Sequence, residues 1–175
     1  MNEFICTWGK TPIIITILTI LGIFITSILM IITYTKRYKM HGKNQGLVVA
    51  VLIIGYLLPL ILVFTFLKMP TKISVDNENL VVSQIKGKIS IPISEITEIR
   101  EPQNNDFENN VRTSGSGGLF GYLGQFENPQ LGNIQMYVTD KKNRFIVKTK
   151  NQVYVFNCKD REKLIQIIDN QINKQ

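Results

Sequence analysis

Between residues 13 and 34 the chain reads IIITILTILGIFITSILMIITY, a run of 22 residues without a charged side chain. A second uncharged run of 21 residues, LVVAVLIIGYLLPLILVFTFL, occupies residues 47–67. About 20 apolar residues in a helix span the roughly 30 Å hydrocarbon core of a bilayer. A buried helix of a soluble protein is rarely apolar on every side for so long. The sequence therefore predicts two transmembrane helices, joined by residues 35–46 into a hairpin.

The first run has the features of an uncleaved helix. It is longer than the apolar core of a signal peptide, which has roughly 7–15 residues, and basic residues follow it. Aromatic residues expected at the membrane interfaces flank it, namely Trp8, Tyr34 and Tyr38. Hydroxyl side chains within it are expected to bond back to the helix backbone; they are Thr16, Thr19, Thr26, Ser27 and Thr33. Gly22 and Gly55 permit close contact between the two helices, and Pro59 predicts a kink in the second.

The net charge of +7 lies mainly beside the apolar runs, since residues 1–69 carry +5 and residues 70–175 only +2. This distribution favours membrane anchoring over nucleic-acid binding, which needs positive charge on the folded domain. The loop between the runs contains Lys36, Arg37, Lys39 and Lys43. By the positive-inside rule we expect a multi-pass cell-membrane protein with this loop in the cytoplasm and the C-terminal domain outside. The same four side chains are candidates for contact with anionic lipid head groups, although setting the topology alone would explain them.

From residue 70 the pattern changes to the period of two that is typical of strands. Alternating or β-rich stretches cover residues 71–76, 80–85, 89–93, 94–99, 134–139, 144–149 and 153–157, with short polar turns between them. The last three predict a meander of hairpins. An apolar stripe of Leu164, Ile167, Ile168 and Ile172 follows Asp160, a candidate N-cap, and predicts a C-terminal helix.

Two apolar helices followed by about seven strands and one helix resemble the bacterial PH-like (pleckstrin-homology-like) family of membrane proteins. The resemblance rests on residues 91–96 (IPISEI), residues 112–132 and residues 134–140 (IQMYVTD), and it covers the C-terminal 105 residues or so. It implies a mainly-β domain at residues 70–175, a partly open barrel capped by the C-terminal helix, after a membrane hairpin at residues 1–69. It implies no particular ligand, because fold does not give function.

Six of the chain's twelve glycines lie between residues 115 and 132, interleaved with aromatic residues. We interpret this segment as a loop between strands. It either closes the barrel or contacts a ligand or partner, because glycine permits positive φ and close backbone approach, and binding residues are frequent on loops. A phosphate loop is disfavoured by the missing GxxxxGK[ST] spacing. The candidate contact residues are Arg112, Gly115, Gly117, Gly118, Phe120, Gly121, Tyr122, Gly124, Phe126 and Gly132.

The sequence predicts no catalytic, cofactor or metal site. The only histidine, His41, lies between the apolar runs, which leaves the β-rich region without an imidazole base. Cys6 and Cys158 are the only cysteines and have no metal-site spacing; they could pair only if the N-terminal tail met the domain. Residues 101–110 are polar and predict a mobile loop, in which Asp106 and Glu108 are expected to be solvated.

These observations favour a non-catalytic binding module held at the bilayer, with a protein partner or a second copy of the chain as its target. A small-molecule substrate is not expected. Two alternatives remain open. One is an accessory subunit recognised through its transmembrane helices, and the other is a lipid-binding domain at the membrane surface.

Overall fold

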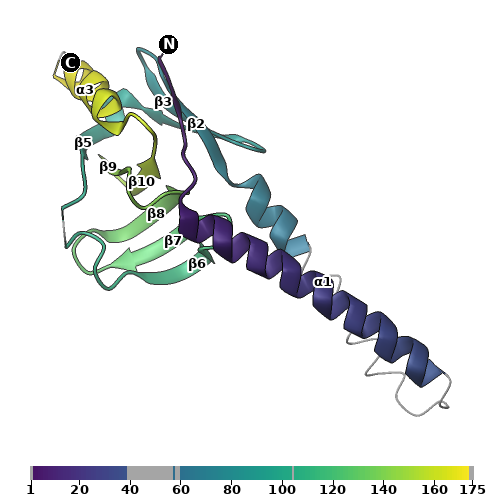
Figure 1. Cartoon of the computed structure of the whole chain (residues 1–175). Coiled ribbons are helices and arrows are strands. Elements are labelled where there is room, and N and C mark those ends of the chain that lie inside the picture. Colours follow the sequence, from purple (N-terminus) through teal and green to yellow (C-terminus); the bar gives the residue numbers. More distant parts are fainter. Residues whose placement is uncertain (1, 39–56, 58–59, 104, 174–175) are drawn as a thin grey trace.

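The computed structural model describes residues 2–38, 57, 60–103 and 105–173. Its helices are α1 (Lys10–Tyr38), the short 3-10 helix η1 (Ile93–Glu95) and α3 (Arg161–Ile172), and residues 60–67 are also helical. The strands are β1 (Asn2–Ile5), β2 (Pro70–Val75), β3 (Asn79–Gln84), β4 (Lys88–Pro92), β5 (Ile96–Arg100), β6 (Val111–Gly117), β7 (Tyr122–Asn128), β8 (Gly132–Val138), β9 (Arg144–Thr149) and β10 (Val153–Asn157). Figure 1 shows α1 and the helical residues before β2 leaving one side of a domain made of these strands.

The strands form two sheets that do not close into a barrel. One sheet has the order β1-β2-β3-β4, and the other has the order β5-β9-β10-β8-β7-β6. The main core lies between the sheets and contains Ile73, Leu80, Phe145 and Phe156, all fully buried. Helix α3 contacts β5 and η1 and buries Leu164 and Ile168 in this core, while Ile167 and Ile172 are partly buried against it. The predicted apolar stripe and C-terminal helix are therefore confirmed; Asp160 occupies the N-cap position without a capping hydrogen bond from its side chain.

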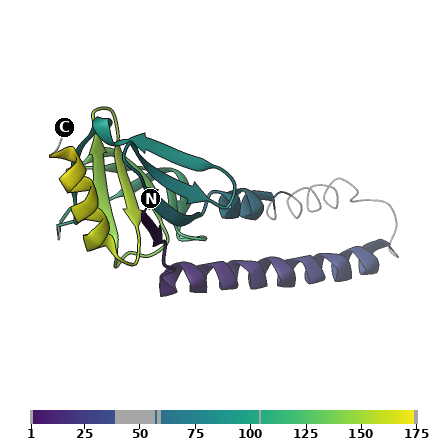
Figure 2. The ribbon, with the colours of Figure 1, turned by 90° about the horizontal axis from the view of Figure 1, so that it is seen from above.

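The first strand was not predicted from the sequence. β1 pairs antiparallel with β2, with Phe4 opposite Ile73, and Phe4 is buried in the main core. β1 lies before the first apolar run and β2 follows the second. The strands that flank residues 10–67 therefore belong to one sheet, and the chain returns to the domain after these residues (Figure 2).

Seven of the ten strands lie where alternation predicted them, but one pairing differs. In the predicted meander of the last three strands, the hairpin of β9 with β10 is confirmed. The pairing of β8 with β9 is wrong, because β10 lies between them and is parallel to β8. The link between β8 and β9 passes the end of β10, and there the buried Asn157 Oδ1 accepts a hydrogen bond of 2.7 Å from Thr139 N. This bond connects the β8–β9 link to the end of β10. The link can therefore pass β10, which pairs with both strands.

In the described part of the chain one helical stretch, Lys10–Thr33, is long and apolar enough to cross a membrane. Most of the second predicted helix lies outside the described residues, as do Gly55, Pro59, His41, Lys39 and Lys43. Its last eight residues, 60–67, are helical. Lys36 and Arg37 belong to the last turn of α1.

Candidate functional site

The glycine-rich segment is a β-hairpin, and the interpretation as a loop is wrong. β6 and β7 pair antiparallel, with Gly115 opposite Gly124. Both glycines have positive φ, and a Cβ on Gly124 would lie 2.4 Å from Ser114 O and 2.9 Å from Gly115 Cα. Glycine is required here because the two backbones approach too closely for a side chain.

The turn of this hairpin contacts the helices. Phe120, itself at φ 57°, donates from its backbone N to Thr16 Oγ1 over 2.9 Å, and both residues are buried. Its ring lies 5.3 Å from that of Phe66, between centroids. Met69 and Leu123 complete a small apolar cluster here with Phe120. The hairpin therefore joins the β domain to both apolar segments, and we call this contact the helix junction.

The other predicted contact residues have separate surroundings. Gly117 lies beneath the Arg112 guanidinium, and Gly118 and Gly121 form the turn at φ 142° and 137°. Lys141 Nζ lies 4.3 Å from the ring centroid of Tyr122, and Phe126 is buried in a second core with Met136. Gly132 has φ 70° and open space around it. The glycine-rich segment is thus held by the pairing of β6 with β7 and by the contact of its turn with the helices. That these residues contact a ligand or partner stays a prediction.

A second set of contacts fixes the chain between β1 and α1. Thr7 O accepts hydrogen bonds from Thr139 Oγ1 (2.6 Å) and Asn157 Nδ2 (3.0 Å), and Gly9 N donates to Thr139 O over 2.8 Å. Thr139 and Asn157 are fully buried, so these bonds hold the start of α1 against the ends of β8 and β10.

The N-terminal tail does meet the domain, as cysteine pairing would require. Cys6 and Cys158 are free thiols buried in the same core, and Lys159 N donates to Ile5 O beside them. Burial raises the pKa of each thiol to about 12. Both are therefore protonated and unreactive at neutral pH.

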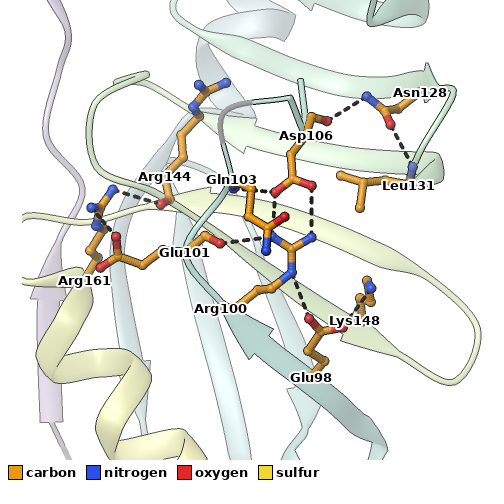
Figure 3. Close-up of polar contacts among 10 residues, drawn as sticks. All are labelled: Glu98, Arg100, Glu101, Gln103, Asp106, Asn128, Leu131, Arg144, Lys148 and Arg161. Atoms are coloured by element: carbon orange, nitrogen blue, oxygen red, sulfur yellow. Dashed lines mark hydrogen bonds and ion pairs between the residues drawn. The ribbon is translucent and has the colours of Figure 1, made fainter. Parts of the chain in front are cut away.

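Figure 3 shows a polar cluster on β5 and the loop that follows it. The two carboxylate oxygens of Asp106 accept from the Arg100 guanidinium, and one of them also accepts from Gln103 N at 2.6 Å. Glu98 lies between Arg100 Nε at 2.8 Å and Lys148 Nζ at 2.7 Å. The expectation that Asp106 is solvated is wrong, because its partners let it be buried at 4% exposure.

The cluster reaches into the neighbouring elements. Asn128 Nδ2 donates to Asp106 O over 2.8 Å, and the Arg161 guanidinium pairs with Glu101 (Figure 3). The Arg144 guanidinium lies 4.0 Å from the ring centroid of Phe107. Residues 101–110, predicted to be mobile, are thus fastened to β5, β7, β9 and α3 through their described residues.

The electrostatics of the cluster suit a structural role. The Arg100 hydrogen bonds hold the pKa of Asp106 below its usual value, against the opposing effect of burial. Hydrogen bonding from Lys148 lowers the pKa of Glu98 in the same way. Both carboxylates are engaged by cations, which makes them poor proton donors near neutral pH. Among the described residues no group of three or more His, Cys, Asp or Glu side chains could hold a metal ion.

Sequence reasoning missed Thr16, Thr139 and Asn157. Thr16 was expected to bond back to its own helix, as Thr19, Thr26, Ser27 and Thr33 do. It is instead the acceptor for Phe120, 104 residues away. No local pattern marks such a partner, although the glycine spacing indicated that something approaches closely.

In a comparison with known protein families, residues 71–172 match the family described as Bacterial PH domain. Neither the comparison with curated proteins nor that with solved structures gave a match. The matched residues include β2 to β10 and α3, all of the β-rich domain except β1. The match covers more than half of the chain, and family membership indicates a binding or interaction module. The chain therefore belongs to the bacterial PH domain family.

Proposed function

We propose that the chain is a non-catalytic interaction module anchored in a membrane by its two apolar segments. The observation that carries this proposal is α1, most of whose apolar side chains beyond Thr16 are exposed and have no cover from the described residues. Leu21 is 51% exposed and Phe24 is 65% exposed. Exposed apolar surface along a whole helix is unstable in water and suits a bilayer.

The pairing of β1 with β2 supports a hairpin over a single span. A chain that leaves the domain through α1 must return to the same sheet before β2. The second apolar run ends at Leu67, three residues before β2, and its last part is helical. Two antiparallel spans satisfy both conditions, and they put β1 and the whole β domain on one side of the membrane.

The expected partner is a protein or a second copy of the chain. The edge strand β6 supports this, because Val111 to Gly115 are all exposed and β6 has a neighbour on one side only. An edge strand can add a strand from another chain. A specific phosphoinositide pocket has less support, since residues 70–175 carry a net charge of only +2.

Membrane extraction tests the anchor. The full chain should stay in the membrane pellet after an alkaline carbonate wash. The variant Leu21→Asp/Phe24→Asp/Leu57→Asp/Leu60→Asp, with two acidic residues in each apolar segment, should move to the supernatant, because each acidic residue at mid-helix costs about 3 kcal/mol of insertion free energy. The control with Ala at the same four positions should remain in the pellet. Release of the unmodified chain by carbonate would refute the anchor.

A second candidate is an accessory subunit recognised through its helices. Gly22 favours it, because a Cβ added there would meet no atom of the described residues within 4 Å, so they leave this face of α1 uncovered. Gly22→Leu should then weaken self-association or partner cross-linking in membranes, while Val111→Lys/Ser114→Lys on β6 should not. The opposite result would favour recognition by the β domain.

A further inference from the structure

The turn between β3 and β4 lies against the end of the second apolar run. Ile85 N donates to Met69 O over 3.1 Å, and Lys86 N donates to Leu67 O over 2.9 Å. Gln84 Nε2 donates to Lys68 O over 2.9 Å. Three hydrogen bonds therefore fix this turn to consecutive residues 67–69. Figures 1 and 2 show the tip of the β3–β4 hairpin on the side of the domain from which the helices leave.

Three lysines gather at this contact. They are Lys68 just after the apolar run, Lys86 in the turn and Lys88 at the start of β4, and we call them with Ile85 the lysine turn. Within the described part of the chain no carboxylate pairs with any of the three, whereas Lys72 pairs with Glu3 and Lys148 with Glu98. The Lys68 ammonium lies 4.6 Å from the Phe64 ring centroid, on the helix side. The lysine turn is a local positive surface without an internal counter-charge.

The depth of the lysine turn follows from the hydrogen bonds. Leu67 is the last residue of an uncharged run that is long enough to span the hydrocarbon core. Lys86 is bonded directly to Leu67, so it lies where the hydrocarbon ends and the phosphates begin. Ile85, exposed at 38%, adds an apolar side chain at the same level. At this depth the lysine ammonium groups would lie among the lipid phosphates, and the Ile85 side chain would lie at the boundary with the acyl chains.

We propose that the lysine turn binds the anionic phospholipid head groups of the bilayer that holds the chain. This proposal rests on the membrane anchor proposed above and adds its lipid preference. It concerns the end of the helices next to the domain, and its residues differ from Lys36, Arg37, Lys39 and Lys43, for which the sequence predicts lipid contacts. The three ammonium groups come from two segments and act as separate point charges. They therefore attract anionic lipids in general and select no single head group.

The test uses the full chain in lipid nanodiscs, with Ile85→Cys carrying a polarity-sensitive fluorophore. The native thiols, Cys6 and Cys158, are buried and leave this site to be labelled alone. Nanodiscs of phosphatidylcholine are compared with nanodiscs that also contain phosphatidylglycerol. Quenching by the neutral quencher acrylamide reports how far the label is shielded.

Phosphatidylglycerol should shield the label, and salt at about 0.5 M should reverse much of the effect, because these charges are exposed and screened. Replacing Lys68, Lys86 and Lys88 by Gln should abolish the dependence of shielding on phosphatidylglycerol. Each lysine is expected to contribute about fivefold to the association constant of the lysine turn with the anionic bilayer surface. The matched control Lys142→Gln/Lys150→Gln/Lys163→Gln makes the same charge change at three other exposed lysines and should keep the dependence.

Three results would overturn the proposal. One is equal shielding in both lipids by a chain that is inserted in the nanodisc. Another is an equal loss in the control variant. The third is equal shielding by inorganic phosphate without anionic lipid, which would indicate a general anion site. A chain that does not enter nanodiscs at all would instead contradict the membrane anchor, and co-purification with the nanodisc distinguishes this failure.

Discussion

Two neighbouring segments, the polar loop 101–110 and the glycine hairpin β6–β7, are held by opposite means. In the loop, Gln103 N donates to the carboxylate of Asp106, which the Arg100 guanidinium neutralises. In the hairpin, Phe120 N donates to the hydroxyl of Thr16. Each backbone donor is satisfied by a side-chain oxygen, but only the first depends on charge. The second depends on a residue of the apolar helix.

This difference separates what belongs to the β domain from what belongs to the anchor. The partners of the polar loop all lie within residues 98–161. The glycine hairpin has contacts with α1 and with the helical segment before β2. We therefore expect the loop to respond to pH and the hairpin to respond to changes in the helices. Hydrogen exchange at the Gln103 and Phe120 amides compares the two directly.

The largest effect is expected from Gly124→Ala. The new Cβ would meet the backbone of β6 at positive φ, and strain with overpacking should cost about 3–5 kcal/mol of the free energy of unfolding. Urea unfolding in detergent measures the change in the free energy of unfolding. In hydrogen exchange, the protection of the Phe120 amide should fall before that of the Gln103 amide. Gly132→Ala is the control, because it has positive φ but open space, and should cost about 1–2 kcal/mol. Equal costs would mean that close approach of the strands is not what requires Gly124.

Asp106→Ala should have the next largest effect. It leaves Arg100 with Glu98 and the Glu101 carbonyl oxygen and removes the acceptor of Gln103 N, so we expect a loss of about 2–4 kcal/mol. Exchange at Gln103 should accelerate strongly while Phe120 stays protected. Glu108→Ala, an exposed carboxylate in the same loop, should change the free energy of unfolding by less than about 0.5 kcal/mol. Equal loss at Gln103 and Phe120 would show that the two segments unfold together.

Thr16→Val tests the hairpin from the helix side. The shape is kept, but Phe120 N loses its acceptor in a buried place, which should cost about 1–2 kcal/mol. Protection should fall at Phe120 and not at Gln103. Thr26→Val removes a hydroxyl that bonds only to its own helix and should change neither amide. Unchanged protection at Phe120 in Thr16→Val would contradict the helix junction.

The smallest effect is expected from acid. The folded-state pKa of Asp106 is lowered, so its contribution to stability is complete above the unfolded value of about 3.9 and is lost as pH falls through the folded value. Glu98 acts in the same direction, although it is more exposed. Below about pH 4 the protection factor at Gln103 should drop before that at Phe120, whose partner does not titrate. If the protection factors of both amides fell together with pH, the loop would not depend on charge more than the hairpin does.

Alternating or β-rich stretches in the sequence predict most of the β domain. β3 and β4 bury every second residue or fewer, whereas β9 and β10 bury consecutive residues because both of their faces are covered. Alternation fails at β6 and β7 because glycines contribute no side chain to the period of two. The pairing of β10 with β8 also cannot be read locally, since it depends on where a later strand inserts.

The helix junction and the pairing of β1 with β2 depend on still longer range. Thr16 meets Phe120, and Phe4 meets Ile73, across intervals that no periodicity describes. The glycines at 115 and 124 nevertheless indicated close approach correctly. The same residues suggested a surface loop only because sequence reasoning does not show what approaches them.

The pairing of β1 with β2 sets an order on biosynthesis. β1 is translated roughly 4–15 s before the end of β2, at ordinary rates of synthesis. During this interval Phe4 and Cys6 have no sheet to join, while the apolar residues between the strands have already been synthesised. The core that contains Phe4 can therefore be completed only after residues 10–67 have led the chain back to β2. For the proposed two-span anchor, pairing of the first strand therefore depends on insertion of both segments, and a chain in which only one of them crosses the bilayer would leave the four-stranded sheet one strand short.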